Sequence, residues 1–204
     1  MIKSTFYNLP EEKKCRLILA AKKEFIRVSY NEASINKIIK DAGISRGSFY
    51  TYFDDKSDLA RCLMDEYFKT IGIQIKDALK QGNGDIFAMF TQLFDITIEY
   101  TELKNDMELF HSLFRCMHSS SESEGPIIYD KEVKNKHLDY IMGMINREKL
   151  NVSSDDDLKD LLELLFIVTK QSLAKIFLKN ATKEVAKQSF LNKINILKNG
   201  VLKL

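Results

Sequence analysis

Apolar side chains recur every third or fourth residue along almost the whole chain, which is the spacing of one face of an α-helix. The clearest stripe has members at four-residue intervals: Leu59, Leu63, Tyr67, Ile71, Ile75 and Leu79. The breaks between such stripes are short. The 204 residues include only eight Gly and two Pro, fewer turn residues than a doubly wound α/β fold or a β-sandwich needs. The sequence therefore predicts an all-α fold of about nine helices.

The order of these helices indicates two domains. Three small helices come first and longer ones follow, with Gly82-Asn83-Gly84 as the clearest linker between two of the long helices. A chain of this length suits one compact body with at most a small appended module. We predict a small N-terminal domain over residues 1–55 and a larger helical domain over residues 56–204.

Charge, segment hydrophobicity and cysteine content indicate the expected partners and cellular compartment. The net charge of +2 is too small to indicate a nucleic-acid partner by itself, although residues 1–60 hold 11 Lys or Arg against 8 Asp or Glu. The N-terminus lacks the pattern of a secretory signal, and no stretch approaches the length of a membrane span. We therefore expect a cytoplasmic protein without a membrane partner. Cys15, Cys62 and Cys116 are scattered within helical patterns and are expected to be reduced and buried.

Residues 34–53 follow the pattern of a helix-turn-helix. Ser34 can cap a short helix that ends at Gly43, a residue able to adopt the left-handed conformation that closes a helix. After a tight turn, Ser45 can cap a second short helix that runs to Phe53. A helix-turn-helix inserts its second helix into the DNA major groove, with the start of that helix facing the base edges. The alternative is a plain corner of two packed helices in which Gly43 is only a cap.

The residue types at the start of the second helix suit contact with DNA. Arg46 can bond the O6 and N7 atoms of guanine together, and Ser48 can bond several base edges. Gly47 has no side chain to keep the helix away from the groove. Three residues of types that bind backbone phosphate follow: Tyr50, Tyr52 and Lys56. Amides near Ser34 can also face a phosphate.

Many of these residues match a known family at fixed spacing. The matching positions are Ile18-Leu19-x-Ala21, Phe25, Tyr30, Ser34-Ile35-x-x-Ile38 and Ala42-Gly43-Ile44-Ser45-x-Gly47-x-x-Tyr50-x-Tyr52-Phe53-x-x-Lys56-x-x-Leu59. With them, residues 9–59 resemble the DNA-binding domain of the tetracycline-repressor (TetR/AcrR) family of bacterial transcription regulators. Glu24 departs from the family pattern, in which an apolar residue is usual. The remaining helices resemble the family only in length and general pattern.

The resemblance implies a sequence-specific regulator, a repressor released by a small effector, that binds double-stranded palindromic operator DNA. It implies backbone contacts by Ser34, Tyr50, Tyr52 and Lys56, and base-edge contacts by Asn36, Lys37, Arg46 and Ser48. With Ser45 and Gly47, these ten residues are the predicted DNA-binding set.

The resemblance also implies a homodimer formed mainly by the last two long helices. The sequence supports this independently, because the helix at about 158–178 is apolar on more than half of its circumference. That is more apolar surface than one intramolecular face requires. The alternative is a helix buried wholly within its own subunit.

Regulators of this family usually hold a small effector inside the larger domain. Phe- and Met-rich stripes would suit an apolar compound, and His111 and Arg115, one helical turn apart, could bind a polar or anionic group. The candidate pocket residues are Phe90, Phe94, Phe110, His111, Phe114, Arg115 and Met142. The alternative for the apolar members is ordinary core packing, and for the polar pair a surface position.

An enzyme is the competing class of function. The three histidines, His111, His118 and His137, form no cluster with metal-ligand spacing, and the sequence has no dinucleotide loop, P-loop or nucleophile elbow. We therefore predict no enzymatic activity, no catalytic residue, no metal and no cofactor. The alternative function is a helical ligand or partner sensor that does not act through DNA, against which the DNA-contacting residue types of the second helix argue.

Overall fold

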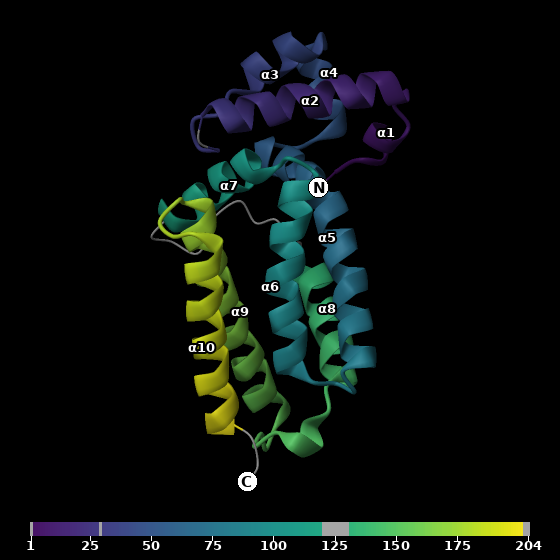
Figure 1. Ribbon diagram of the computed structural model, residues 1–204. Coiled ribbons are helices and arrows are strands. Elements are labelled where there is room, and N and C mark those ends of the chain that lie inside the picture. Colours follow the sequence, from purple (N-terminus) through teal and green to yellow (C-terminus); the bar gives the residue numbers. More distant parts are fainter. Residues whose placement is uncertain (1, 29, 120–130, 202–204) are drawn as a thin grey trace. The chain divides into compact units, whose positions relative to one another are not determined.

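The computed structural model describes residues 2–28, 30–119 and 131–201. In these ranges the chain forms ten α-helices, one 3₁₀ turn and no strand (Figure 1), which confirms the predicted all-α fold. The elements are α1 (Ser4–Tyr7), α2 (Glu11–Arg27), α3 (Ile35–Ala42), α4 (Arg46–Tyr52), α5 (Lys56–Gln81), α6 (Ile86–Leu103), α7 (Met107–Ser119), α8 (Lys131–Met144), η1 (Arg147–Lys149), α9 (Asp155–Phe177) and α10 (Lys183–Val201). Only α1 and η1 add to the nine predicted helices, since a single turn is too short to show a period.

Contacts divide the described residues into two units. The first unit holds residues from 2–68 and 106–119, and the second holds residues 69–105 and 131–201. Helix α5 is continuous through the boundary after Phe68. The expected domain boundary after residue 55 falls inside the first unit, because α7 packs against α2 and the first half of α5 joins the same core.

The core of the first unit gathers on one face of α2. Leu17, Ala21 and Phe25 of this face are buried almost completely, and α2 packs against both α3 and α7. Phe49 and Phe53, from α4 and its end, are also fully buried and lie 5.5 Å apart between ring centres. The short helices of this unit are therefore held mainly by aromatic and aliphatic burial.

The prediction that the cysteines are buried is wrong for Cys15, whose side chain is exposed. The buried row of α2 starts at Leu17, and a displacement of two residues turns about 200° around an α-helix. Cys15 therefore points away from the core although it has helical spacing to other apolar residues. Cys62 is half-buried, and the side chain of Cys116 lies outside the described residues.

Glu24 occupies a buried position on α2, with only 2% of its surface exposed. Its two carboxylate oxygens accept hydrogen bonds from the Nε and Nη2 atoms of Arg27, both at 2.8 Å. One of them also accepts from the backbone N–H of Ser34 at 3.1 Å. The hydrogen bonds from Arg27 and Ser34 lower the pKa of Glu24, against the opposing effect of burial. The carboxylate thus ties α2 to the residue that caps α3.

We expect Glu24→Gln to destabilise the first unit by about 1–3 kcal/mol, because a buried acceptor of three hydrogen bonds loses its charge. Since the pKa of Glu24 is lower in the folded state, its contribution is complete above the ordinary glutamate pKa of about 4.3 and is lost as pH falls through the lowered value. Urea titrations of both proteins between pH 3 and 7 should show their stabilities converging toward acid. Glu11→Gln, at an exposed ion pair with Lys14, is the control and should change stability by less than about 1 kcal/mol.

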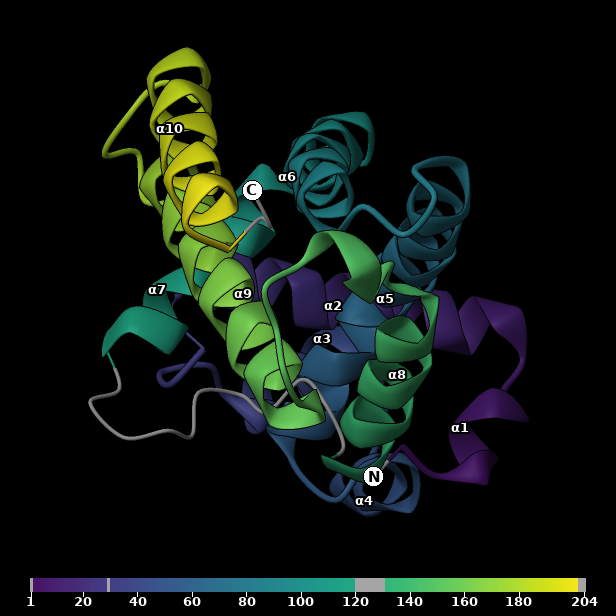
Figure 2. The same cartoon turned by 90° about the horizontal axis from the view of Figure 1, so that it is seen from below.

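The second unit is built on α6, α9 and α10, which contact one another pairwise. Figure 2 views these helices more nearly end-on and shows α10 beside α9. Phe94 of α6 stacks on Phe190 of α10 with ring centres 4.5 Å apart, and Phe90 meets Phe166 of α9 edge-on at 4.9 Å. These aromatic contacts join three helices that are far apart in the sequence.

The predicted linker between α5 and α6 is a tight, packed turn. Asn83 and Gly84 both have positive φ angles, of 49° and 74°. The carbonyl oxygen of Gly84 accepts a hydrogen bond from the backbone N–H of Asn146, at 3.1 Å. A Cβ atom at Gly84 would lie 2.3 Å from that same nitrogen. The end of α5 therefore sits directly against the chain that follows α8, and only glycine fits there.

Candidate nucleic-acid interface

Helices α3 and α4 form the predicted helix-turn-helix. Ser34 caps α3 by accepting from the backbone N–H of Lys37 at 3.4 Å, and Ser45 caps α4 by accepting from that of Ser48 at 3.0 Å. Gly43 closes α3 in the left-handed conformation, with φ of 67°. Both helices pack on the first unit's core, since α3 contacts α2 and α4. The caps therefore have the positions that the sequence predicted.

Arg46 lies on the exposed surface of α4 together with two polar neighbours. Its Nη1 atom donates to Asn36 Oδ1 at 2.8 Å, and its Nη2 atom donates to the Tyr50 hydroxyl at 3.4 Å. The guanidinium carbon also lies 5.6 Å from the centre of the Tyr50 ring. The structure thus brings together three predicted site residues from two helices and holds the arginine fork at the surface.

A second flank of α4 carries Ser45, Ser48 and Tyr52. The two serine hydroxyls are 2.8 Å apart. Gly47 stands between the two flanks, and a Cβ atom there would meet only the Ser45 hydroxyl, at 3.9 Å. The fold itself therefore has room for a side chain at Gly47.

The two predicted lysines already have partners within the chain. Lys37 forms an ion pair with Asp41 at 2.6 Å. Lys56 donates to the backbone carbonyl of Asn31 at 2.8 Å, and its ammonium lies 4.9 Å from the centre of the Tyr30 ring. Lys56 is thereby held close to the start of α3, whereas Lys37 would have to exchange Asp41 for a phosphate or a base.

The N-terminal segment contacts the end of α4, which the sequence did not predict. The backbone N–H of Lys3 donates to the carbonyl of Tyr52 at 3.0 Å, and its ammonium donates to that of Tyr50 at 2.8 Å. The hydroxyl of Thr5 donates to the carbonyl of Thr51. These three carbonyls lie in the last turn of a helix, where no partner exists within the helix itself. Residues 3 and 5 therefore cap α4 from a distant part of the chain.

Two further contacts anchor this segment. Phe6 is buried, with its ring centre 5.0 Å from that of Phe53. Lys3 forms an ion pair with Asp54 at 2.7 Å, and this contact lowers the pKa of Asp54 to about 2. No periodic pattern over so few residues could have revealed the segment, because all its partners are more than 40 residues away.

The candidate effector residues fall in both units. Phe90, Phe94 and Met142 are buried in the second unit, while Phe110 and His111 belong to the first. Phe110 packs edge-on against Tyr67 at 5.0 Å, and Nδ1 of the half-buried His111 lies 3.6 Å from a carboxylate oxygen of Glu108. The side chains of Phe114 and Arg115 lie outside the described residues.

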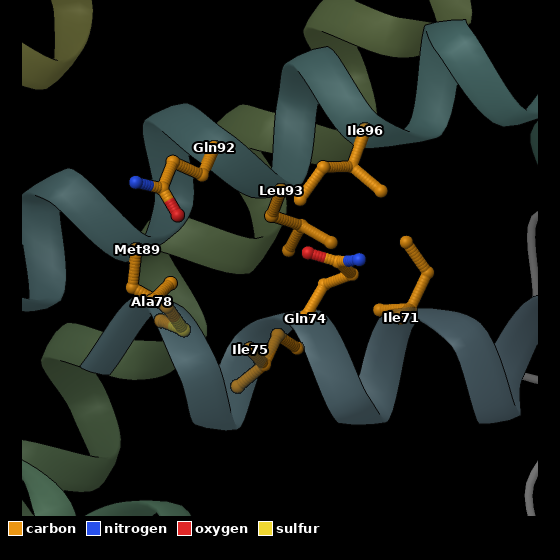
Figure 3. Close-up of a pocket in the computed structure, with 8 residues that line it drawn as sticks. All are labelled: Ile71, Gln74, Ile75, Ala78, Met89, Gln92, Leu93 and Ile96. Atoms are coloured by element: carbon orange, nitrogen blue, oxygen red, sulfur yellow. The ribbon is translucent and has the colours of Figure 1, made fainter. Parts of the chain in front are cut away.

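A depression lies between α5 and α6 in the second unit. Figure 3 shows the side chains that line it, with Gln74 of α5 extending toward Leu93 and Ile96 of α6. The depression opens to solvent, and the side chains that line it leave no room for a water molecule. Phe90, Phe94 and Met142 do not line it.

Over the part of the chain that the structure describes, no three His, Cys, Asp or Glu side chains are grouped so that they could hold a metal ion. No helix among the same residues is both long and apolar enough to cross a lipid bilayer.

The fold and the exposed residues of α4 define a helix-turn-helix protein. Residues 17–62 match the family model described as bacterial regulatory proteins of the tetR family, and residues 85–201 match the model of the tetracyclin repressor-like C-terminal domain. The second match alone covers more than half of the chain. The chain belongs to the TetR family.

Two curated relatives from Bacillus subtilis (strain 168) are described as HTH-type transcriptional regulators. The chain is 30% identical to YuxN over 124 residues, which is 61% of this chain and 39% of the relative. It is also 30% identical to YvdT over 92 residues, 45% of this chain and 47% of the relative. The chain thus matches less than half of the length of either relative. The family is one of regulators, and membership confirms the prediction that the chain is not an enzyme.

Solved structures share the fold. A TetR family regulator from Chloroflexus aurantiacus J-10-FL is 24% identical, with a TM-score of 0.55 and full coverage of both chains. Thermus thermophilus FadR in complex with lauroyl-CoA is 16% identical, with a TM-score of 0.59 over 89% of this chain and 91% of that one. Bacillus subtilis FadR in complex with stearoyl-CoA is 18% identical, with a TM-score of 0.57 over 91% and 98%.

Proposed function

We propose that the protein is a cytoplasmic, sequence-specific DNA-binding repressor of transcription that a small effector releases from its operator. One observation carries the DNA-binding part: Arg46 is exposed on α4 and oriented by Asn36 and Tyr50. A planar guanidinium presented at the start of a recognition helix suits bidentate bonding to guanine in the major groove. This arrangement favours DNA binding over the alternative function, a ligand or partner sensor that does not act through DNA.

Selection from randomised or sheared genomic DNA tests this function. We expect the recovered fragments to share an inverted repeat whose half-sites lie one helical turn, about 34–36 Å, apart. Mobility shifts on that repeat should weaken as salt concentration rises, since phosphate contacts release counterions. If the protein binds a ligand or partner but enriches no DNA sequence, the sensor without DNA is the correct function.

We propose further that two copies associate through α9 and α10. Both helices carry exposed apolar side chains in a single chain: Leu164, Phe166 and Ile167 on α9, and Val185 and Ile196 on α10. Exposed apolar side chains on two adjacent helices suit burial against a second copy across a two-fold axis. The dimer would supply the two recognition helices that a palindrome requires.

Leu164→Asp is expected to shift the protein from dimer to monomer and to weaken operator binding at least tenfold. Leu164 is 50% exposed in the single chain, and a carboxylate buried at its place in a dimer would lack a partner. Sedimentation at micromolar concentration measures the change. Ile73→Asp is the control, because Ile73 is 60% exposed on α5 of the same unit. A wild-type monomer that still binds the operator tightly would contradict the dimer.

The effector is proposed to be small and largely apolar and to enter the second unit between its helices. The depression between α5 and α6 has no room for a ligand as it stands, so a ligand there would have to separate the two helices. Helix α5 continues from Lys56 through this unit, so such a movement can change how the two recognition helices are spaced. Two proteins of the same fold hold acyl-CoA thioesters, which makes these the first compounds to titrate.

A true effector should weaken DNA affinity by about 5–150-fold, a coupling free energy of about 1–3 kcal/mol. Reciprocity requires operator DNA to weaken effector binding by the same factor. Calorimetric titration of lauroyl-CoA with and without saturating operator measures both affinities. Equal affinities would exclude that compound as an inducer, since a ligand shifts an equilibrium only through differential binding.

A further inference from the structure

A polar depression of about 170 Å³ lies between α2 and the flank of α4 that does not carry Arg46. Its lining residues are Leu9, Lys13, Arg16, Leu17, Gly43, Ile44, Ser45, Ser48 and Tyr52. The space is large enough for several water molecules and therefore for a phosphate group. It combines two cationic side chains with three hydroxyls, which is the donor set that proteins use for phosphate.

The two cations of this depression have no partner within the described part of the chain. Lys13 and Arg16 are both exposed and lie on one face of α2, three residues apart. Neither forms an ion pair or hydrogen bond with a described residue, and Glu12, four residues before Arg16, is not paired with it. Lys14, by contrast, forms an ion pair with Glu11 at 3.2 Å. Two adjacent positive charges without a counter-ion favour an external anion.

We propose that Lys13 and Arg16, with Ser45 and Tyr52, bind a phosphodiester of the DNA backbone. This inference rests on the proposed DNA-binding function and adds a contact from α2 to those expected from α3, α4 and Lys56. The anion is a phosphate of the DNA strand that runs along the α2 side of the recognition helix.

The depression lies on the flank of α4 that does not carry Arg46. On α4, Arg46 and Tyr50 form one flank, which reaches α3 through Asn36. Ser48 and Tyr52 form the other flank, which faces α2 across the depression. The major groove is about 12 Å wide and is bounded by a phosphate backbone on each side, while a helix with its side chains is about 10–12 Å across. A helix in that groove therefore meets phosphates on both flanks, and the α2 flank is the one that holds unpaired cations.

The test compares Lys13→Gln, Arg16→Gln and the double variant with Lys14→Gln. The control removes one positive charge from the same helix, at a lysine that already has a partner. All three replacements introduce a good helix former, and the thermal melts of the four variants should agree with that of the wild type. Fluorescence anisotropy would measure the affinity for the recovered operator and for an unrelated duplex between 50 and 300 mM salt.

Each lost contact should lower the slope of log K against log salt by about 0.9, and at 0.1 M salt weaken binding by about tenfold per half-site. The loss should be the same for operator and unrelated duplex, because phosphates carry no sequence. A second arm replaces chloride by inorganic phosphate at constant ionic strength. Stronger inhibition of the wild type than of the double variant is expected, because inorganic phosphate competes with the DNA phosphodiester for Lys13 and Arg16. Equal inhibition of both proteins would show that DNA does not use these side chains and would overturn the proposal.

The results distinguish the phosphate site from the proposed DNA-binding function on which it rests. A wild type that binds its operator, with Lys13→Gln and Arg16→Gln no weaker than Lys14→Gln, would overturn the phosphate site and leave the DNA-binding function intact. A wild type that binds no DNA would overturn the function and the site together.

Discussion

Arg46→Ala should weaken operator binding by about 1–3 kcal/mol per half-site and should relax the preference at one base position of each half-site. The structure gives the reason for a loss of this size. Hydrogen bonds to Asn36 and Tyr50 already restrict the guanidinium, so little conformational freedom remains to be lost when it binds guanine. A dimer would lose the interaction twice. Affinity measured on the operator and on its single-base variants would check both expectations.

Lys56→Ala is the contrasting variant. Its ammonium is held beside the Asn31 carbonyl and the Tyr30 ring, just before the start of the helix-turn-helix. We expect it to weaken all DNA sequences alike and to lower the salt slope by about one charge per half-site. If Lys56→Ala changed the sequence preference and Arg46→Ala did not, the two roles would have been assigned to the wrong residues.

Gly84→Ala is expected to destabilise the second unit by about 2–5 kcal/mol. The new Cβ would lie 2.3 Å from the backbone nitrogen of Asn146 and 2.7 Å from the carbonyl oxygen of Met144, closer than a Cβ atom can lie to atoms that are not bonded to it. The positive φ of 74° adds strain for any residue with a side chain. Relief requires the turn to move away from the end of α8, which breaks the hydrogen bond between Gly84 and Asn146. Thermal melts should show Tm lowered by at least about 5 °C.

Gly143→Ala is the matched control for this variant. Gly143 is exposed within α8, and a Cβ atom there would have no neighbour within 4 Å. The same substitution should be neutral or stabilise by up to about 1 kcal/mol, because alanine favours the helix. Equal melting temperatures for Gly84→Ala and Gly143→Ala would show that the turn does not pack as the structure has it.

The sequence by itself determined the helices, their caps and the helix-turn-helix. Ser34, Gly43 and Ser45 act on backbone groups within four residues, so the residue types alone predict where α3 ends and α4 begins. The spacing of Arg46 and Tyr50 likewise places both on one flank of α4 whatever surrounds them. Interactions confined to one helical turn can be read directly from the order of residues.

Only the tertiary structure decided which helix faces are buried and which distant segments meet. It turned Cys15 outward and joined the buried Glu24 to Ser34 at the start of α3. It brought Lys3 to the end of α4, 47 residues away. Each of these outcomes depends on the direction in which one helix packs on another. Periodicity shows that a helix has an apolar side, but the partner that covers that side is set by packing over the whole unit.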